Sequence, residues 1–222
     1  MRVLLLALFG CALAGCASVP FAAPELVPTR QLTTAELVGT GWDAGGQTLR
    51  LRQSGLFEWH GRRLVLDGLV QLDGKEHTAR LVGMNELGVK AFDLTVTPGG
   101  LEEHFLLPEL AATPGLAAAV GGAVRRIYLA PRPRTDDRLV IEARDYRLER
   151  RDTDREIRFV FGGPQPLLLE TRMKSADEEW RVRYYQYRPT AGRWLPGGVI
   201  LDDRRAGYRL TLWLEEGKVV NE

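Results

Sequence analysis

Few side chains of this 222-residue chain have the types and spacing that catalysis or metal binding requires. The histidines lie in separate predicted elements and lack the i, i+4 spacing of a helical metal site: His60, His77 and His104. Neighbouring carboxylates fall in predicted turns or at strand ends, where solvated acidic side chains are expected: Asp136-Asp137, Asp177-Glu178-Glu179, Asp202-Asp203 and Glu215-Glu216. No serine lies in a nucleophile-elbow pattern, and the chain has neither a phosphate-binding loop nor a dinucleotide fingerprint. We therefore expect no catalytic residue, metal or cofactor and a protein that is not an enzyme, although a hydrolase built on two spatially paired carboxylates stays open.

The cysteines indicate how the chain is processed. Arg2 and the apolar run after it are typical of a secretory signal, and the run is too short to cross a bilayer. Leu13-Ala14-Gly15-Cys16 closes this segment and resembles the lipobox of bacterial lipoproteins. That resemblance implies cleavage before Cys16 and lipid attachment to its sulfur and new amino group; an ordinary secretory signal that ends near a cysteine is the alternative. Since Cys11 would leave with the signal, no thiol would remain for a disulfide, a thiolate metal site or a nucleophile.

The lipobox also predicts a location. A lipoprotein cysteine that carries several acyl chains is stably anchored, whereas one chain binds a membrane only reversibly. Ala17 follows the cysteine. In the common envelope sorting scheme an aspartate there favours retention in the inner membrane, so its absence points to the outer membrane. We expect a lipid-anchored domain that faces the periplasm.

The charge of the chain argues against a nucleic-acid partner. It carries 30 basic and 29 acidic side chains, and removal of the signal takes only Arg2 from that tally. The mature domain is therefore near neutral, with no global field to attract nucleic acid or anionic lipid. The arginines between Arg138 and Arg158 alternate with Asp and Glu, as on a solvated strand face.

Three regions are expected: a signal peptide at 1–15, the acylated cysteine with a Pro/Ala-rich tether at 16–31, and a single domain at 32–222. The tether is expected to be extended and semi-rigid because its prolines are spaced among small residues: Pro20, Pro24 and Pro28. Thr33 and Glu36 have the spacing of a capping box, which predicts a short helix that ends by Gly39 or Gly41.

A period of two residues recurs on both sides of one helical segment. The runs expected to form strands are 47–59 with a break at Gly55, Leu64–Leu72 with an interruption at Gly68, Glu76–Met84, Val89–Thr97, Arg138–Arg150, Glu156–Phe161, Leu167–Lys174, Trp180–Tyr187, Gly198–Asp202 and Tyr208–Leu214. Apolar residues at helical spacing predict an amphipathic helix at about 115–128, with Thr113 as N-cap, Pro114 at the first helical position and Pro131 beyond its end. This order predicts an α+β fold with one antiparallel sheet of about 10–11 strands and the helix over part of one face.

The remaining candidates for function are apolar and aromatic. They either form a filled core between sheet and helix or line an apolar cavity for an acyl chain beneath a curved sheet. The residues expected to line such a cavity are Trp59, Phe92, Leu94, Phe105, Val120, Val124, Trp180, Tyr184, Tyr208 and Leu210. Periodicity does not separate the two interpretations, because both need inward-facing apolar residues.

Two stretches resemble LolB-type outer-membrane lipoproteins of the LolA/LolB superfamily. In Leu81–Leu94 an apolar strand runs into Asn85-Glu86-Leu87-Gly88 and a second apolar strand leaves it, as at the Asn-Pro-Leu-Gly turn of that family. Trp194–Asp202 followed by Gly207–Leu212 is similar to the proline, strand, turn, strand ending of the family. The helix expected from Pro114 lies where the family has an amphipathic helix that begins with proline.

The resemblance implies an incomplete antiparallel barrel closed by helices around a hydrophobic cavity. Proteins of that family receive acylated lipoproteins from a periplasmic carrier and place them in the outer membrane. The exposed leucine of their turn contributes to membrane insertion of the cargo, and it falls on Leu87 of this chain. Two features depart from the family: Glu86 replaces the proline of the turn, and the N-terminal helix is shorter.

These observations lead to two interpretations of function. In the first, a monomeric outer-membrane lipoprotein binds an acyl chain, or the lipid moiety of a lipoprotein, and helps to deliver it to the outer membrane. In the second, a non-catalytic scaffold lipoprotein supports an envelope assembly or export complex, with a filled core and no ligand. A continuous cavity that opens toward residues 85–88 would favour the first.

Overall fold

One antiparallel sheet of twelve strands forms the framework of the protein. The computed structural model describes residues 19–41, 46–190 and 192–220. In the order in which they pair, the strands are β5 (Leu101–Leu106), β4 (Lys90–Val96), β3 (Thr78–Met84), β2 (Arg62–Asp73), β1 (Thr48–Trp59), β14 (Tyr208–Val220), β13 (Gly198–Asp203), β10 (Glu179–Tyr185), β9 (Leu167–Lys174), β8 (Glu156–Gly162), β7 (Asp145–Arg151) and β6 (Arg138–Ile141). Two short strands, β11 (Arg188–Thr190) and β12 (Arg193–Leu195), pair separately.

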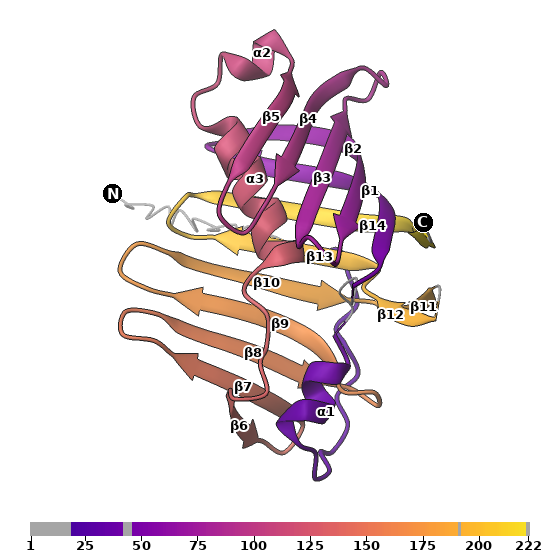
Figure 1. Cartoon of the computed structure of the whole chain (residues 1–222), viewed down its shortest axis with the longest axis vertical. Helices are drawn as coiled ribbons and strands as arrows, with labels where there is room; N and C mark the ends of the chain where they lie inside the picture. Colours follow the sequence, from indigo (N-terminus) through magenta and orange to yellow (C-terminus); the bar gives the residue numbers. More distant parts are fainter. Residues whose placement is uncertain (1–18, 42–45, 191, 221–222) are drawn as a thin grey trace, which may run out of the picture.

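The sheet is strongly curved and does not close, because β5 and β6 lie at its two opposite edges (Figure 1). This confirms the α+β fold with an incomplete antiparallel barrel. The main sheet has twelve strands where the sequence predicted about 10–11. One of the differences is the run Arg138–Arg150, expected as a single strand, which residues 142–144 divide into β6 and β7.

Alternation along the strands separates the two faces of the sheet. On β1, Leu49 and Leu51 are buried on the concave side while Arg50 and Arg52 are exposed on the outer side. The hairpin from β1 to β2 turns at His60 and Gly61, which both have positive φ, 48° and 77°. Consecutive residues of this kind form the tight turns that match the twist of paired strands.

The helices are short, and one group of them covers the concave face. α1 (Thr34–Gly39) has the expected capping box between Thr33 and Glu36. After β5 come α2 (Pro108–Ala111), α3 (Leu116–Val124) and a π-helical turn, η1 (Arg125–Leu129). The helix was expected to begin at Thr113-Pro114, but Gly115 is its N-cap and has a left-handed conformation, φ 79°, which turns the chain before the helix starts. The N-cap was therefore predicted two residues too early, whereas the expected range of about 115–128 agrees with α3 and η1.

The connection from β5 to β6 passes over the concave face from one edge of the sheet toward the other (Figure 1). α3 approaches β5 closely at Gly121, where a Cβ atom would lie 2.9 Å from Leu101 Cδ1. Its buried residues, among them Val120 and Val124, join the main hydrophobic core with the inward side chains of the sheet. The helix therefore fills much of the concavity.

The N-terminal stretch packs against the sheet without regular secondary structure. Phe21 is 7% exposed and lies on the outer face, with its ring 5.3 Å from that of Tyr185 and 5.7 Å from that of Trp213. Further along, the Thr29 amide donates to the Ala143 carbonyl. The segment expected as a tether is therefore bound to the folded domain from Phe21 onward. No helix among the described residues is long and apolar enough to cross a membrane.

Candidate ligand site under the helix

Two small cavities lie between the helix and the concave face. The first has a volume of about 50 Å³, and its lining includes Gly55, Phe57, Gly68, Leu81, Gly83, Phe92, Val120, Val124 and Leu210. The second has a volume of about 100 Å³, and its lining includes Val38, Phe161, Leu168, Thr171 and Tyr184. Ile127 and Tyr128 of η1 line both cavities. The last turn of the helix thus separates the halves of one mostly apolar space, which we name the trough.

Tyr128 is the side chain that divides the trough. It is buried, and its hydroxyl donates a hydrogen bond to Gln53 Oε1 on β1. Burial raises the pKa of Tyr128 well above its ordinary value, so the phenol is neutral at physiological pH. The π-helical form of η1 is a rare one that often marks functional sites. Displacing this one turn would join the two cavities.

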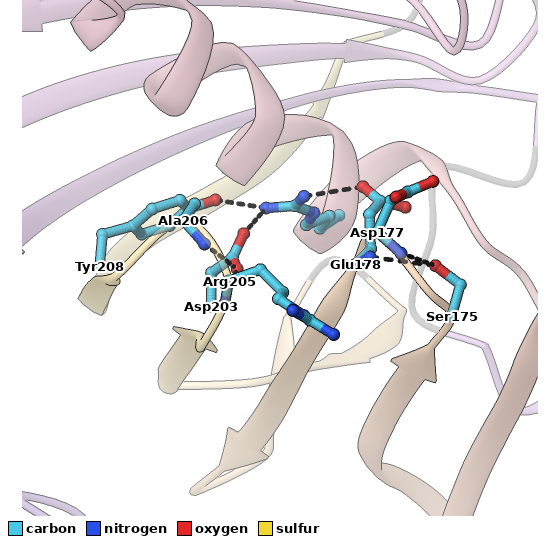
Figure 2. A network of polar contacts seen from close by, with 8 residues as sticks. Ser175, Asp177, Glu178, Asp203, Arg205, Ala206 and Tyr208 are labelled. Carbon is cyan, nitrogen blue, oxygen red and sulfur yellow. Dashed lines mark hydrogen bonds and ion pairs between the residues drawn. The ribbon is translucent and has the colours of Figure 1, made fainter.

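Arg126 fixes the same turn to the sheet through a polar network (Figure 2). Its guanidinium donates to Asp203, to the Tyr208 hydroxyl at 2.7 Å and to Glu178 Oε1 at 2.9 Å. It also lies 5.6 Å from the centre of the Trp180 ring, within cation–π distance. Burial alone would lower the pKa of Arg126, but Tyr208 and the two carboxylates outweigh it and raise that pKa, so the side chain stays charged.

The carboxylates of this network are held by hairpin turns (Figure 2). Asp203 Oδ1 accepts the amides of Arg205 and Ala206 in the β13–β14 turn, which leaves Oδ2 for Arg126. In the β9–β10 turn, the Ser175 hydroxyl accepts the Glu178 amide at 3.0 Å. Side chains that accept turn amides keep a fixed direction. The acidic clusters that the sequence placed in turns therefore serve here as anchors for the helix.

The connection that follows the helix has a second anchor. Asp137 is 6% exposed, and both of its carboxylate oxygens accept from Arg150 on β7, at 2.7 and 3.0 Å. Arg150 also donates to the Arg132 carbonyl, and the Arg134 amide donates to Asp137. The chain from η1 to β6 is thus held at both ends by arginine–aspartate pairs, with the trough in between.

The structure distributes the ten residues expected to line a cavity over several places. Phe92, Val120, Val124 and Leu210 line the first cavity, and Tyr184 lines the second. Leu94 is fully buried in the core, and Phe105 is half-buried on β5 with the Lys90 ammonium 4.8 Å from its ring centre. Trp59, Trp180 and Tyr208 line a separate polar hollow near the hairpin turns. Their roles in binding stay predictions.

Sequence reasoning missed the polar residues of the site. Alternation along β1 places Gln53 on the inward face of the strand. Since buried polar side chains are normally hydrogen-bonded, an inward glutamine could have indicated a buried polar partner. The sequence also does not show that Arg126, near the end of the predicted helix, meets Asp203, 77 positions away.

The loop from β3 to β4 presents an apolar tip. Leu87 is 85% exposed and Val89 is 49% exposed. Asn85 Oδ1 accepts the amides of both residues at 3.0 Å, and Gly88 has a positive φ of 74°, so the turn is well defined. Gly83 lines the first cavity and pairs with Phe92 one step before this loop. Contact of Leu87 with a membrane or cargo stays a prediction, as does lipidation at Cys16, which lies outside the described residues.

The histidines occupy unrelated positions. His60 and His77 lie in hairpin turns with positive φ, and His104 on β5 is hydrogen-bonded to Thr95. Within residues 19–41, 46–190 and 192–220, no three His, Cys, Asp or Glu side chains come close enough to hold a metal ion.

Solved structures with the same architecture support the fold. The chain is similar to a LolA superfamily protein from Nitrosomonas europaea, with 11% identity, a TM-score of 0.57 and coverage of 86% of this chain and 96% of that chain. It is also similar to an outer membrane lipoprotein-sorting protein domain from Vibrio parahaemolyticus, with 7% identity, a TM-score of 0.50 and coverage of 85% and 93%. At these identities the likeness shows the fold alone. The LolA-like half-barrel is confirmed, whereas placement with the LolB type stays a prediction.

The sequence itself matches one family. No curated protein matches the chain. Residues 50–215 match the model of the family described as "Protein of unknown function (DUF3261)", and none of the comparisons indicates a catalytic family. The matched stretch begins in β1 and ends in β14, so it contains Tyr128, Gln53 and the Arg126 network. The chain therefore belongs to the DUF3261 family and has a LolA-like fold.

Proposed function

We propose that this protein is an outer-membrane lipoprotein that binds an acyl chain in the trough and helps to deliver the acylated cargo to that membrane. The observation that carries the proposal is the divided trough: two cavities with mainly apolar linings share Ile127 and Tyr128 and are separated only by one helical turn. The fold is that of LolA superfamily proteins, and one protein of similar structure is described as a lipoprotein-sorting domain. Acylation at Cys16 would tether the domain to the membrane, facing the periplasm.

Binding requires the last helical turn to move. In this conformation both cavities are far below the roughly 300–1,000 Å³ of ordinary ligand pockets, so the trough is closed. Outward movement of η1 removes Tyr128 from between them and exposes apolar walls on both sides. Burying an acyl chain there returns about 0.8 kcal/mol for each methylene, which offsets the lost contacts of the helix. A periplasmic carrier is the expected donor of the cargo.

Release would take place at the β3–β4 loop. Gly83 and Phe92 line the first cavity and pair with each other a few residues from the exposed Leu87. An exposed leucine beside an anchored domain can enter the interfacial region of the bilayer and give the acyl chain an apolar path. Glu86 is exposed next to Leu87, so only the tip of the loop is suited to such contact.

The test is native mass spectrometry of residues 17–222 purified from the periplasm, followed by uptake of a fluorescent fatty acid. We expect co-purified acyl species and saturable uptake. Tyr128→Ala should increase uptake, because it joins the two cavities. The control is Tyr185→Ala, which also removes a buried tyrosine ring but on the outer face. If neither the wild-type chain nor Tyr128→Ala takes up a fatty acid, the proposal fails.

The scaffold interpretation has one observation in its favour, namely that the helix fills the concavity and leaves only small cavities. A non-catalytic scaffold of an envelope assembly or export complex needs no ligand and a rigid interior. It predicts no lipid in the purified protein and an envelope partner that crosslinks equally to wild type and Tyr128→Ala. Recovery of a bound acyl species would decide against it.

A further inference from the structure

We propose that the polar hollow near the hairpin turns, to which the outer face of the sheet contributes arginines, docks on the anionic phospholipid headgroups of the membrane that carries the anchor. The hollow, which we name the arginine hollow, has a volume of about 740 Å³. Seven of its lining residues are arginines and four are Asp or Glu. The central arginines come from β9, β10 and β14 and from the β13–β14 turn: Arg172, Arg181, Arg183, Arg204 and Arg209.

The arginines of the hollow share too few carboxylates. Asp202 is the common partner of Arg181, Arg183 and Arg209, at 3.8, 2.9 and 3.6 Å. One carboxylate neutralises the charge of one guanidinium. Three guanidinium groups around Asp202 therefore leave a local excess of positive charge and many N–H donors without an acceptor among the carboxylates.

Glu179 is shared in the same way by Arg172 at 3.7 Å and Arg204 at 3.2 Å. Arg181 has one further carboxylate, Glu170, only at 4.0 Å. Of the other two acids of the hollow, Glu58 pairs with Arg63 and Asp203 is engaged by Arg126. Each carboxylate that lines the hollow is therefore already paired with an arginine, and the hollow keeps a net positive charge.

Two details show that this cluster is organised for an external anion. Arg181 on β10 stands directly opposite Arg172 on β9, and like charges in that position destabilise a sheet. Arg183 Nε is buried and has no hydrogen-bond acceptor within the described residues. A phosphate placed among these groups relieves the repulsion and supplies the missing acceptors, since guanidinium groups bind phosphate oxygens in pairs.

The N-terminal stretch places this hollow near a membrane. Val19 lines the hollow, and Phe21 is fixed beside it by Tyr185 and Trp213. A Cβ atom at Gly198 would lie 2.4 Å from the Phe21 ring, so the slot exists only because that position is glycine. Packing of Phe21 against Tyr185, Trp213 and Gly198 thus fixes the position at which the segment leading to the anchor leaves the domain.

The covalent chain limits the distance between hollow and bilayer. Val19 follows Cys16 by three positions, a stretch of at most about 11 Å when fully extended. That is comparable to the Debye length of about 8 Å at physiological ionic strength, so the excess charge acts on the membrane surface. This inference rests on the acylation of Cys16 that the proposed function includes, and it commits to phospholipid headgroups as the occupant.

The experiment is co-sedimentation of residues 17–222, which contain every described residue, with vesicles of phosphatidylcholine with or without phosphatidylglycerol. Binding should require phosphatidylglycerol and weaken as salt is added. The double variant Arg172→Gln/Arg181→Gln should bind about 25-fold more weakly at low salt, since each basic residue near an anionic surface contributes about fivefold. Arg172→Lys/Arg181→Lys keeps the charge and should retain most of the binding.

The matched control is Arg50→Gln/Arg52→Gln, which removes two exposed arginines of β1 outside the hollow. Thermal unfolding of each variant confirms that it is folded. Equal losses in the two double variants, or binding that does not depend on phosphatidylglycerol, would overturn the proposal. So would inorganic phosphate that abolishes vesicle binding at low millimolar concentration, because the site would then be one for a free anion. Fatty-acid uptake should be unchanged in Arg172→Gln/Arg181→Gln. Vesicle binding at the arginine hollow can therefore fail while acyl-chain binding in the trough holds, and the reverse.

Discussion

Replacing Gly68 with alanine should raise the stability of the protein and lower its uptake of acyl chains at the same time. Gly68 lies on β2 and lines the first cavity. A Cβ atom there meets Gln53 Cγ and Leu81 Cδ1 at 3.6 Å, an ordinary van der Waals distance. The new methyl group therefore enters existing space and requires no movement of its neighbours.

The expected gain follows from two contributions. Glycine within a strand is less favourable than alanine by about 0.5–1 kcal/mol. A cavity of about 50 Å³ costs about 1.2 kcal/mol at roughly 24 cal/mol per Å³, and one methyl group recovers part of that. We expect Gly68→Ala to raise the free energy of unfolding by about 1–2 kcal/mol, measured by urea denaturation.

Two other glycines provide the comparison. A Cβ atom at Gly83, in the same cavity, would lie 2.3 Å from Phe92 Cζ, so Gly83→Ala should lower the free energy of unfolding by about 1–3 kcal/mol. Gly99, in the β4–β5 turn, has nothing within 4 Å of a Cβ position, and Gly99→Ala should change little. Destabilisation by Gly68→Ala comparable to that of Gly83→Ala would refute the packing argument. Increased stability with unchanged fatty-acid uptake would refute the first cavity as part of the binding site.

Three further perturbations address the Arg126 network, the Arg80–Asp93 ion pair between β3 and β4, and the packing of Phe21. Arg126→Gln leaves the buried Asp203 carboxylate, whose side chain is 1% exposed, without its guanidinium, and should lower the free energy of unfolding by about 3–5 kcal/mol; a loss below 1 kcal/mol would show that the network does not hold the helix. The hydrogen bond from Arg80 lowers the pKa of Asp93 in the folded protein. The ionised carboxylate therefore stabilises the fold at pH values above its unfolded pKa of about 3.9, and this contribution is lost as the pH falls through the lower folded pKa. Asp93→Asn should therefore cost about 1 kcal/mol at pH 7 and little at strongly acid pH, and a pH-independent difference in denaturation midpoint would contradict this. Phe21→Ala should cost about 3 kcal/mol in thermal unfolding by loss of its aromatic contacts, and an unchanged transition would mean that the segment is not bound in solution.

The closed trough and the polar network have a common consequence for binding. Moving the last helical turn breaks the contacts of Arg126 with Asp203, Glu178 and Tyr208, so the energy of those contacts sets the threshold for a ligand. Burial raises the pKa of Tyr208 to about 12, so its hydroxyl is neutral and can accept a hydrogen bond from the Arg126 guanidinium throughout the physiological range. A ligand with few methylenes would bury too little surface to offset that threshold.

Much of the framework could be predicted from the sequence because its signals are local. Alternation along β1 and β10 predicted strands and their inward faces, and Thr33 with Glu36 predicted the first helix through contacts three residues apart. The positions of Val120 and Val124 at helical spacing likewise predicted the face that α3 buries. Short-range periodicity is enough for these features, since each depends on neighbours within one or two turns of the chain.

The functional geometry was decided only by the tertiary structure. Periodicity showed that Trp180 and Tyr208 face inward, but the curvature of the sheet determined that they lie at the rim beside Arg126 and not around the trough. No local pattern showed that the arginines of β10 and β14 share one carboxylate, Asp202, because strand pairing brings them together. Such contacts join residues far apart in the chain, and their partners follow from strand order and curvature, which no local pattern encodes.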